Sequence, residues 1–183
     1  MMKRILIVMM LMLSGCSTEQ KTYYQLPNPD VRIPDSSRSM RTLWLEQVTV
    51  ADYLSSAGLV YQLTDVKYAM ASDHLWASPL ERQLYRALIS SLSGAMPGWL
   101  VSSLPVGDDP DVLNVTLNAF HGRYDGRVII RGVWWLKHQN QLLQQDFNLE
   151  LQQQEEGYDA LVRTLSRGWQ QQAQMMAARI KKL

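Results

Sequence analysis

The clearest hydrophobic pattern in the chain lies near its C-terminus. Between Tyr158 and Ile180, apolar residues recur at intervals of three, four and seven, which predicts an amphipathic helix with one buried face. Lys181 and Lys182 follow this segment, and basic residues stabilise the C-terminal end of a helix dipole. The pattern therefore predicts that a long helix ends the domain.

A second amphipathic helix is predicted in the middle of the chain. Leucines recur every four residues from Leu80 to Leu92, and Pro97-Gly98 follows as a stop signal. The run Ser78-Pro79-Leu80-Glu81 is typical of a capping box, in which Ser78 accepts a backbone hydrogen bond and Glu81 reaches back to the Ser78 backbone. We therefore expect the helix to begin at these residues.

Strand patterns occupy much of the remaining chain. Residues 43–50 change phase near Gln47, which indicates a bulge or a strand buried on both faces. Residues 59–63 and 66–70 suggest a hairpin, and residues 23–26 and 99–101 suggest short strands. The segment 27–40 contains three prolines and reads as a surface loop.

Three further strands follow one another directly. Val115, Leu117 and Ala119 alternate with polar residues, as in a half-buried strand. Asp125-Gly126 predicts a type I′ hairpin turn into residues 127–137. Residues 142–151 then return, which completes an antiparallel meander. With the two helices, this order predicts one α+β domain over residues 23–183, an antiparallel sheet with two amphipathic helices on one face.

The N-terminal segment has the pattern of a signal peptide rather than of a spanning helix. Lys3 and Arg4 precede nine apolar residues, 5–13. As a helix this run reaches only about 14 Å, against the roughly 30 Å of a bilayer core. Residues 1–15 are therefore predicted to be removed.

The end of that segment, Leu13-Ser14-Gly15-Cys16, resembles the bacterial lipobox. On this interpretation Cys16 carries an S-diacylglyceryl group and, after cleavage, an N-acyl chain; the alternative is an ordinary signal peptide with an incidental cysteine. Residues 16–22 would then be the lipidated cysteine and a short tether, whose six residues after Cys16 reach about 20 Å at full stretch. Ser17, rather than Asp, favours the outer membrane over retention in the inner membrane.

Composition and charge narrow the function classes. Without residues 1–15 the chain has 168 residues, with 16 basic and 17 acidic side chains, which argues against nucleic-acid binding. A single cysteine excludes a disulfide framework and a multi-cysteine metal site.

Candidate chemistry is sparse. The histidines His74, His121 and His138 lack ligand spacing, so neither a metal nor a cofactor is predicted. An acylated Cys16 has no free thiol for catalysis, and no nucleophile or nucleotide motif occurs, so no catalytic residue is proposed. Trp134 and Trp135 would face opposite sides of a strand, and the pattern does not decide which of them is exposed.

Several segments in order resemble the ABC-type transport auxiliary lipoproteins. The resemblance covers nearly the whole chain and lies in the lipobox and in residues 23–26, 43–50, 52–54, 59–62, 75–80, 113–116 and 122–126. Tyr61-Gln62 and Ser78 depart from the pattern of many relatives, which weakens any transfer of detail from the wider family.

The resemblance implies a non-enzymatic outer-membrane lipoprotein that faces the periplasm. Its implied partners are a membrane-anchored protein with MCE domains and a polytopic inner-membrane protein, in lipid trafficking that maintains envelope integrity. Homo-oligomerisation, as a ring around a tubular partner, is a further hypothesis. Two functions stay open: an adaptor of the transport complex, or a lipid-binding carrier with its own apolar cavity.

Overall fold

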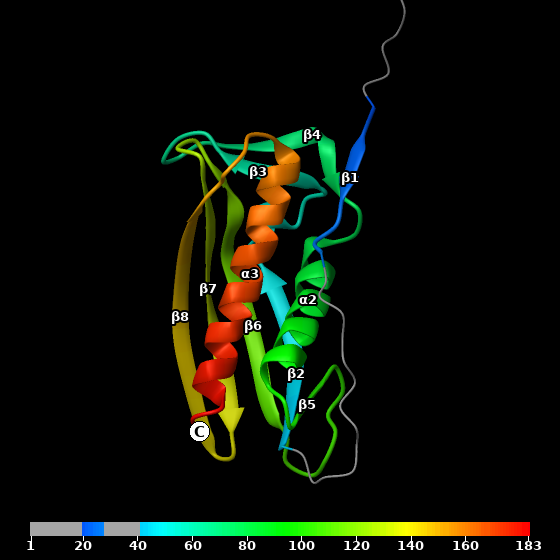
Figure 1. The fold of residues 1–183 in the computed structure, drawn as a ribbon, viewed down its shortest axis with the longest axis vertical. Coiled ribbons are helices and arrows are strands. Elements are labelled where there is room, and N and C mark those ends of the chain that lie inside the picture. The colour runs from blue at the N-terminus through cyan, green and yellow to red at the C-terminus, as the bar shows by residue number, and fades with distance from the viewer. Residues whose placement is uncertain (1–19, 28–40) are drawn as a thin grey trace, which may run out of the picture.

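The computed structural model describes residues 20–27 and 41–183, and these residues form an α+β domain (Figure 1). The predicted fold class is thus confirmed. The elements in this part of the chain are β1 (Thr22–Tyr24), β2 (Arg41–Val50), the 3-10 turn η1 (Asp52–Leu54), β3 (Gly58–Gln62), β4 (Tyr68–Trp76), α2 (Leu80–Ala95), β5 (Trp99–Ser102), β6 (Asp111–Arg123), β7 (Arg127–His138), β8 (Gln141–Gln152) and α3 (Tyr158–Ile180).

Strand β6 is the centre of the sheet. It pairs antiparallel with β7, which pairs antiparallel with β8, so the predicted meander is confirmed. Along its other edge β6 pairs parallel with β2 and then, at Gly122 and Arg123, with β3. The expectation of a wholly antiparallel sheet is corrected, because α2 lies in the connection between β2 and β6, and such a crossover lets two strands run parallel.

The phase change predicted in β2 is a bulge. The register between β2 and β6 shifts between Leu45 and Gln47. An extra residue on one strand lets apolar side chains on both sides of the shift face the same core. Leu45 and Val48 are accordingly both buried.

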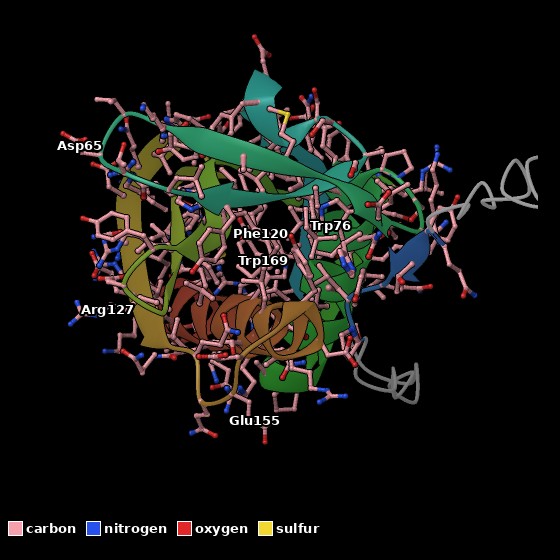
Figure 2. All side chains as sticks on the ribbon, turned by 90° about the horizontal axis from the view of Figure 1, so that it is seen from above. Asp65, Trp76, Phe120, Arg127, Glu155 and Trp169 are labelled. Carbon is pink, nitrogen blue, oxygen red and sulfur yellow. The ribbon has the colours of Figure 1, made fainter. Side chains whose placement is uncertain are left out.

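Helices α2 and α3 lie side by side on one face of the sheet, as predicted (Figure 1). The core lies between the helices and the sheet, where Figure 2 places Trp76, Phe120 and Trp169. The indole Nε1 of Trp169 donates to the carbonyl oxygen of Leu84 at 3.0 Å. A buried indole N–H needs such a partner, and here the bond joins α3 to α2.

The start of α2 differs from the predicted capping box. The helix begins at Leu80, with Pro79 in the cap position and no side-chain cap hydrogen bond. Glu81 instead accepts from the backbone N–H of Val50 at 3.1 Å. The Glu81 carboxylate therefore binds the end of β2, which is distant in sequence, and does not cap its own helix.

The β6–β7 hairpin is confirmed, but its turn is not type I′. Gly126 has a φ of 77°, whereas Asp125 has no positive φ. The Gly126 N–H donates to the carbonyl oxygen of Arg123 at 3.0 Å. This is the geometry of a three-residue loop that ends in a left-handed glycine.

The structure also separates the paired tryptophans of β7. Trp134 is 1% exposed and lies in the core, whereas Trp135 is half-buried on the face of the sheet opposite the helices.

We predict that Gly132→Ala lowers the free energy of unfolding by about 1–3 kcal/mol, because a Cβ there would overlap the backbone oxygen of Thr116 on β6. Gly94→Ala is the matched control. It lies in α2 with open space around its Cβ position, so it should raise stability by about 0.5–1 kcal/mol. Urea unfolding measures both, and equal effects would contradict the close approach of β6 and β7.

Candidate functional site

The predicted lipid-attachment residue, Cys16, lies outside the described residues. The structure does show how the segment that follows it joins the domain. Thr22 pairs with His74 and Tyr24 with Trp76, so β1 extends the sheet parallel to the end of β4. The predicted strand at this position is confirmed, and the chain enters the domain as part of the sheet.

Leu26 fixes the same segment in the core. Its side chain is 2% exposed, and its backbone N–H donates to Oε1 of Gln83 at 2.8 Å. Gln83, itself buried, donates from Nε2 to the carbonyl oxygen of Ser78 at 2.9 Å. The glutamine amide therefore satisfies two backbone groups and connects the N-terminal segment to the start of α2.

An aromatic cluster attaches β1 to α3. The hydroxyl of Tyr24 lies 3.1 Å from Nδ1 of His74, and the His74 ring stacks on Tyr158 with centroids 3.8 Å apart. Burial, and then the carboxylate of Asp159, raise the pKa of Tyr24. The tyrosine is therefore a neutral hydrogen-bonding group at physiological pH.

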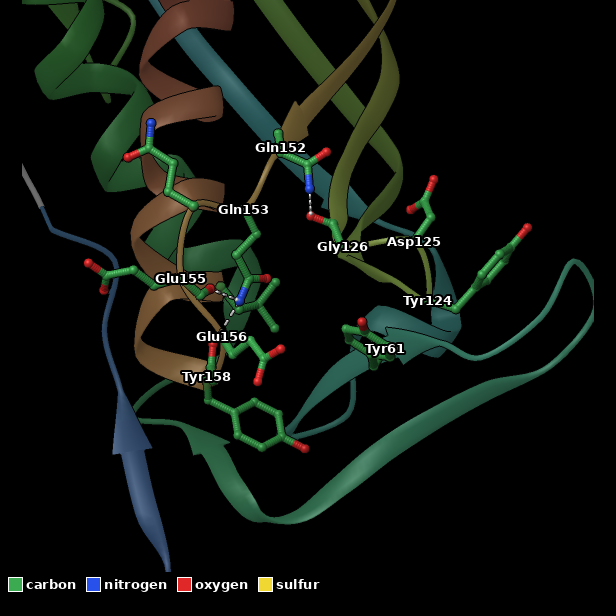
Figure 3. A pocket seen from close by; sticks show the side chains of 12 residues that line it. Tyr61, Tyr124, Asp125, Gly126, Gln152, Gln153, Glu155, Glu156 and Tyr158 are labelled. Carbon is green, nitrogen blue, oxygen red and sulfur yellow. Dashed lines mark hydrogen bonds between the residues drawn. The ribbon is translucent and has the colours of Figure 1, made fainter.

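A surface hollow of about 640 Å³ lies beside this cluster (Figure 3). Its walls come from the end of β3, the β6–β7 turn, the end of β8 and the start of α3, and Tyr61, Tyr124 and Tyr158 contribute aromatic rings. Gln153 spans the loop before α3 by donating to the carbonyl oxygens of Glu155 and Gly157, at 2.7 and 3.1 Å. These bonds order the loop between β8 and α3 that lines the hollow.

Ion pairs hold the turn at the edge of the hollow. Arg123 contacts Asp125 at 2.7 Å and Glu150 at 2.9 Å, and Arg127 contacts Glu150 at 3.2 Å. The hydrogen bonds from Arg123 lower the pKa of Asp125 to about 2, and those from Arg123 and Arg127 also lower the pKa of Glu150. Both carboxylates are thus charged and paired across physiological pH.

The three histidines have separate sets of contacts. His74 belongs to the aromatic cluster, His121 is buried on the opposite face of the sheet, and His138 bonds to Asp111 at 2.6 Å. Burial lowers the pKa of His121. Within residues 20–27 and 41–183 no three His, Cys, Asp or Glu side chains are grouped to hold a metal ion.

This arrangement suits binding and attachment. The hollow presents phenol, amide and carboxylate groups, which can form hydrogen bonds and apolar contacts. Neither α2 nor α3, the helices of the described chain, is both long and apolar enough to span a bilayer.

Gln83, His74 and Tyr158 were not predicted from the sequence to attach the N-terminal segment to the domain. Gln83 had a visible signal, since it is a polar residue beside Leu84 on the predicted apolar stripe of α2. His74 and Tyr158 meet only through pairing of distant segments, which no local pattern shows.

Comparisons of the whole chain point to one family. The family model described as ABC-type transport auxiliary lipoprotein component matches residues 24–177. The intermembrane transport lipoprotein PqiC of Escherichia coli strain K12 is 47% identical over 186 residues, covering 100% of both chains, and the PqiC of Shigella flexneri gives the same figures.

Solved structures show the same fold. A crystal structure of an uncharacterised protein is 50% identical, with a TM-score of 0.80, and the match covers 88% of this chain and 99% of that one. Protein XCC0632 from Xanthomonas campestris is 15% identical with a TM-score of 0.65, covering 85% and 92%, and supports the fold alone.

We predict that Gln83→Leu loosens the N-terminal segment. Without the amide, the buried N–H of Leu26 loses its partner, which should lower the free energy of unfolding by about 1–3 kcal/mol. Hydrogen exchange of residues 22–26 should also become faster. Gln174→Leu, on the exposed side of α3, is the control; equal exchange in the two variants would contradict the role of Gln83.

Proposed function

Because the chain belongs to the family of ABC-type transport auxiliary lipoproteins, we propose that it is a non-catalytic adaptor of an intermembrane lipid-transport complex. Acyl chains on Cys16 hold it in the outer membrane, and the folded domain faces the periplasm. In this role the domain provides a rigid binding surface, and its partners carry out the transport itself.

The observation that carries this proposal is the short, secured connection between Cys16 and the fold. Thr22, the first residue of β1, comes six positions after Cys16, a reach of about 20 Å at full stretch. β1 is then paired with β4, and Leu26 is buried. A pull on the acyl anchor is therefore passed directly to the sheet and core.

We propose a PqiB-like protein with MCE domains as the partner. The support is that the family is an auxiliary component of transport and that two relatives are named intermembrane transport lipoproteins. Such a partner extends from the inner membrane and meets the domain in the periplasm. Self-association into a ring around a tubular partner is part of the same hypothesis.

The adaptor is favoured over a lipid carrier by the nature of the interior. Large side chains, among them Trp134, Trp169 and Phe120, fill the space between helices and sheet. The hollow of about 640 Å³ opens to solvent and includes Asp125, Glu155 and Glu156 among its lining residues. A carrier of acyl chains needs an apolar cavity that shields them from water.

We expect Cys16→Ala to accumulate as uncleaved precursor without acyl label. Ser17→Asp is its counterpart, because it leaves the acylated cysteine intact and changes only the following residue. That variant should be acylated normally but move from the outer-membrane to the inner-membrane fraction. Acyl labelling and density-gradient separation measure the two outcomes; normal processing of Cys16→Ala would overturn the anchor, and an unmoved Ser17→Asp would overturn the sorting.

Crosslinking in intact envelopes tests the partner. The acylated protein should capture an MCE-domain protein, and Cys16→Ala should capture much less, because it is not held at the membrane. The mass of the crosslinked product also reports the number of copies of this chain. Capture of transport-unrelated proteins alone, or co-purification of stoichiometric phospholipid with the isolated domain, would contradict the adaptor.

A further inference from the structure

We propose that the turn between β3 and β4 makes a second contact with the phospholipid bilayer, in addition to the acyl anchor; this inference rests on the acylation of Cys16 proposed above. The turn exposes two aliphatic side chains to solvent. Val66 is 76% exposed and Leu63 is 49% exposed.

The exposure of these side chains is built into the turn. The N–H of Leu63 donates to the carbonyl oxygen of Lys67 at 2.8 Å. The hydroxyl of Thr64 accepts from the backbone N–H groups of Val66 and Lys67, at 3.3 and 3.1 Å. These bonds close the turn and hold Val66 outward, because a hydroxyl that caps local N–H groups stabilises such a turn.

A tyrosine lies beside the turn. Gln62 and Arg123 are the last paired positions of the parallel β3 and β6, so Leu63 and Tyr124 are the next residues after that pair on the two strands. Tyr124 is exposed, and Figure 3 shows its ring pointing away from the sheet. We call Leu63, Val66 and Tyr124 the apolar rim. Tyrosine with aliphatic neighbours is typical of protein surfaces that rest at the headgroup level of a membrane.

The apolar rim lies at the end of the molecule where the tether enters. In Figure 1 the β3–β4 turn, the β6–β7 turn and the start of β1 are all at the top. Figure 2, seen from above, places Asp65 of the turn and β1 on opposite sides of that end. Val66 is eight residues before His74, about 26 Å along an extended strand, and His74 pairs with Thr22 on the neighbouring strand about 5 Å away.

The bilayer is the occupant that this placement favours. The tether of about 20 Å keeps the same end of the domain near the membrane. A tethered surface meets its target at high effective concentration, so even a small apolar contact stays occupied. Contact at two points also limits how far the domain can tilt, which would aim its remaining surface at a periplasmic partner.

The test uses the full-length acylated protein in phospholipid vesicles. Val66→Cys and Leu142→Cys each introduce one reactive thiol, since the only native cysteine is Cys16 and acylation blocks it. Leu142 is a matched control: it is 73% exposed, beside the β7–β8 turn at the opposite end of the molecule. Each thiol carries a fluorophore that nitroxide-labelled lipids quench.

Lipid quenching at residue 66 should be several-fold stronger than at residue 142. Equal quenching in protein that floats with the vesicles would overturn the rim contact and leave the acyl anchor intact. Shielding of residue 66 from aqueous iodide without lipid quenching would also overturn it, because a protein would then cover the turn. Failure of the protein to float would overturn the anchor itself and the rim contact with it.

Discussion

Strand β6 is hydrogen-bonded along both edges, and the other layers of the domain depend on that pairing. β7 follows one edge for most of its length, while β2 and then β3 share the other. Its inward side chains, such as Leu113, Val115 and Phe120, are buried beneath the helices. A strand paired along both edges has nearly all of its backbone N–H and C=O groups hydrogen-bonded. The neighbouring strands and the helices are therefore positioned relative to β6.

The two ends of the domain are held together by different kinds of side-chain contact. At the end opposite the start of β1, Asp111, His138 and Arg41 join the starts of β6 and β2 to the end of β7, and Arg41 also lies over the ring of Trp99. At the end where β1 begins, the contacts gather around β1 and the start of α3. The first set of contacts joins the ends of neighbouring strands within the sheet. The second set connects the domain to the chain that leads toward Cys16.

The adaptor interpretation gives these features one explanation. A protein that passes force between a membrane and a partner needs a secured entry for its tether and a rigid sheet behind it. Tyr24, Leu26 and Gln83 provide the first, through hydrogen bonds and burial. The long strands of the meander provide the second. Around the hollow the described residues contribute tyrosines, amides and paired charges.

The sequence by itself determined the features that repeat locally: the leucine stripe of α2, the long apolar face of α3, the alternation in β6 and the change of phase near Gln47. These follow from the periods of helices and strands, which neighbouring residues display. The tertiary structure alone decided the parallel pairing of β2 with β6, the use of Glu81 by Val50 rather than by its own helix, the burial of Trp134 rather than Trp135, and the meeting of Tyr24, His74 and Tyr158. Each of these depends on contacts between segments tens of residues apart, whose free energy is set by the surrounding packing and leaves no periodic trace in the chain.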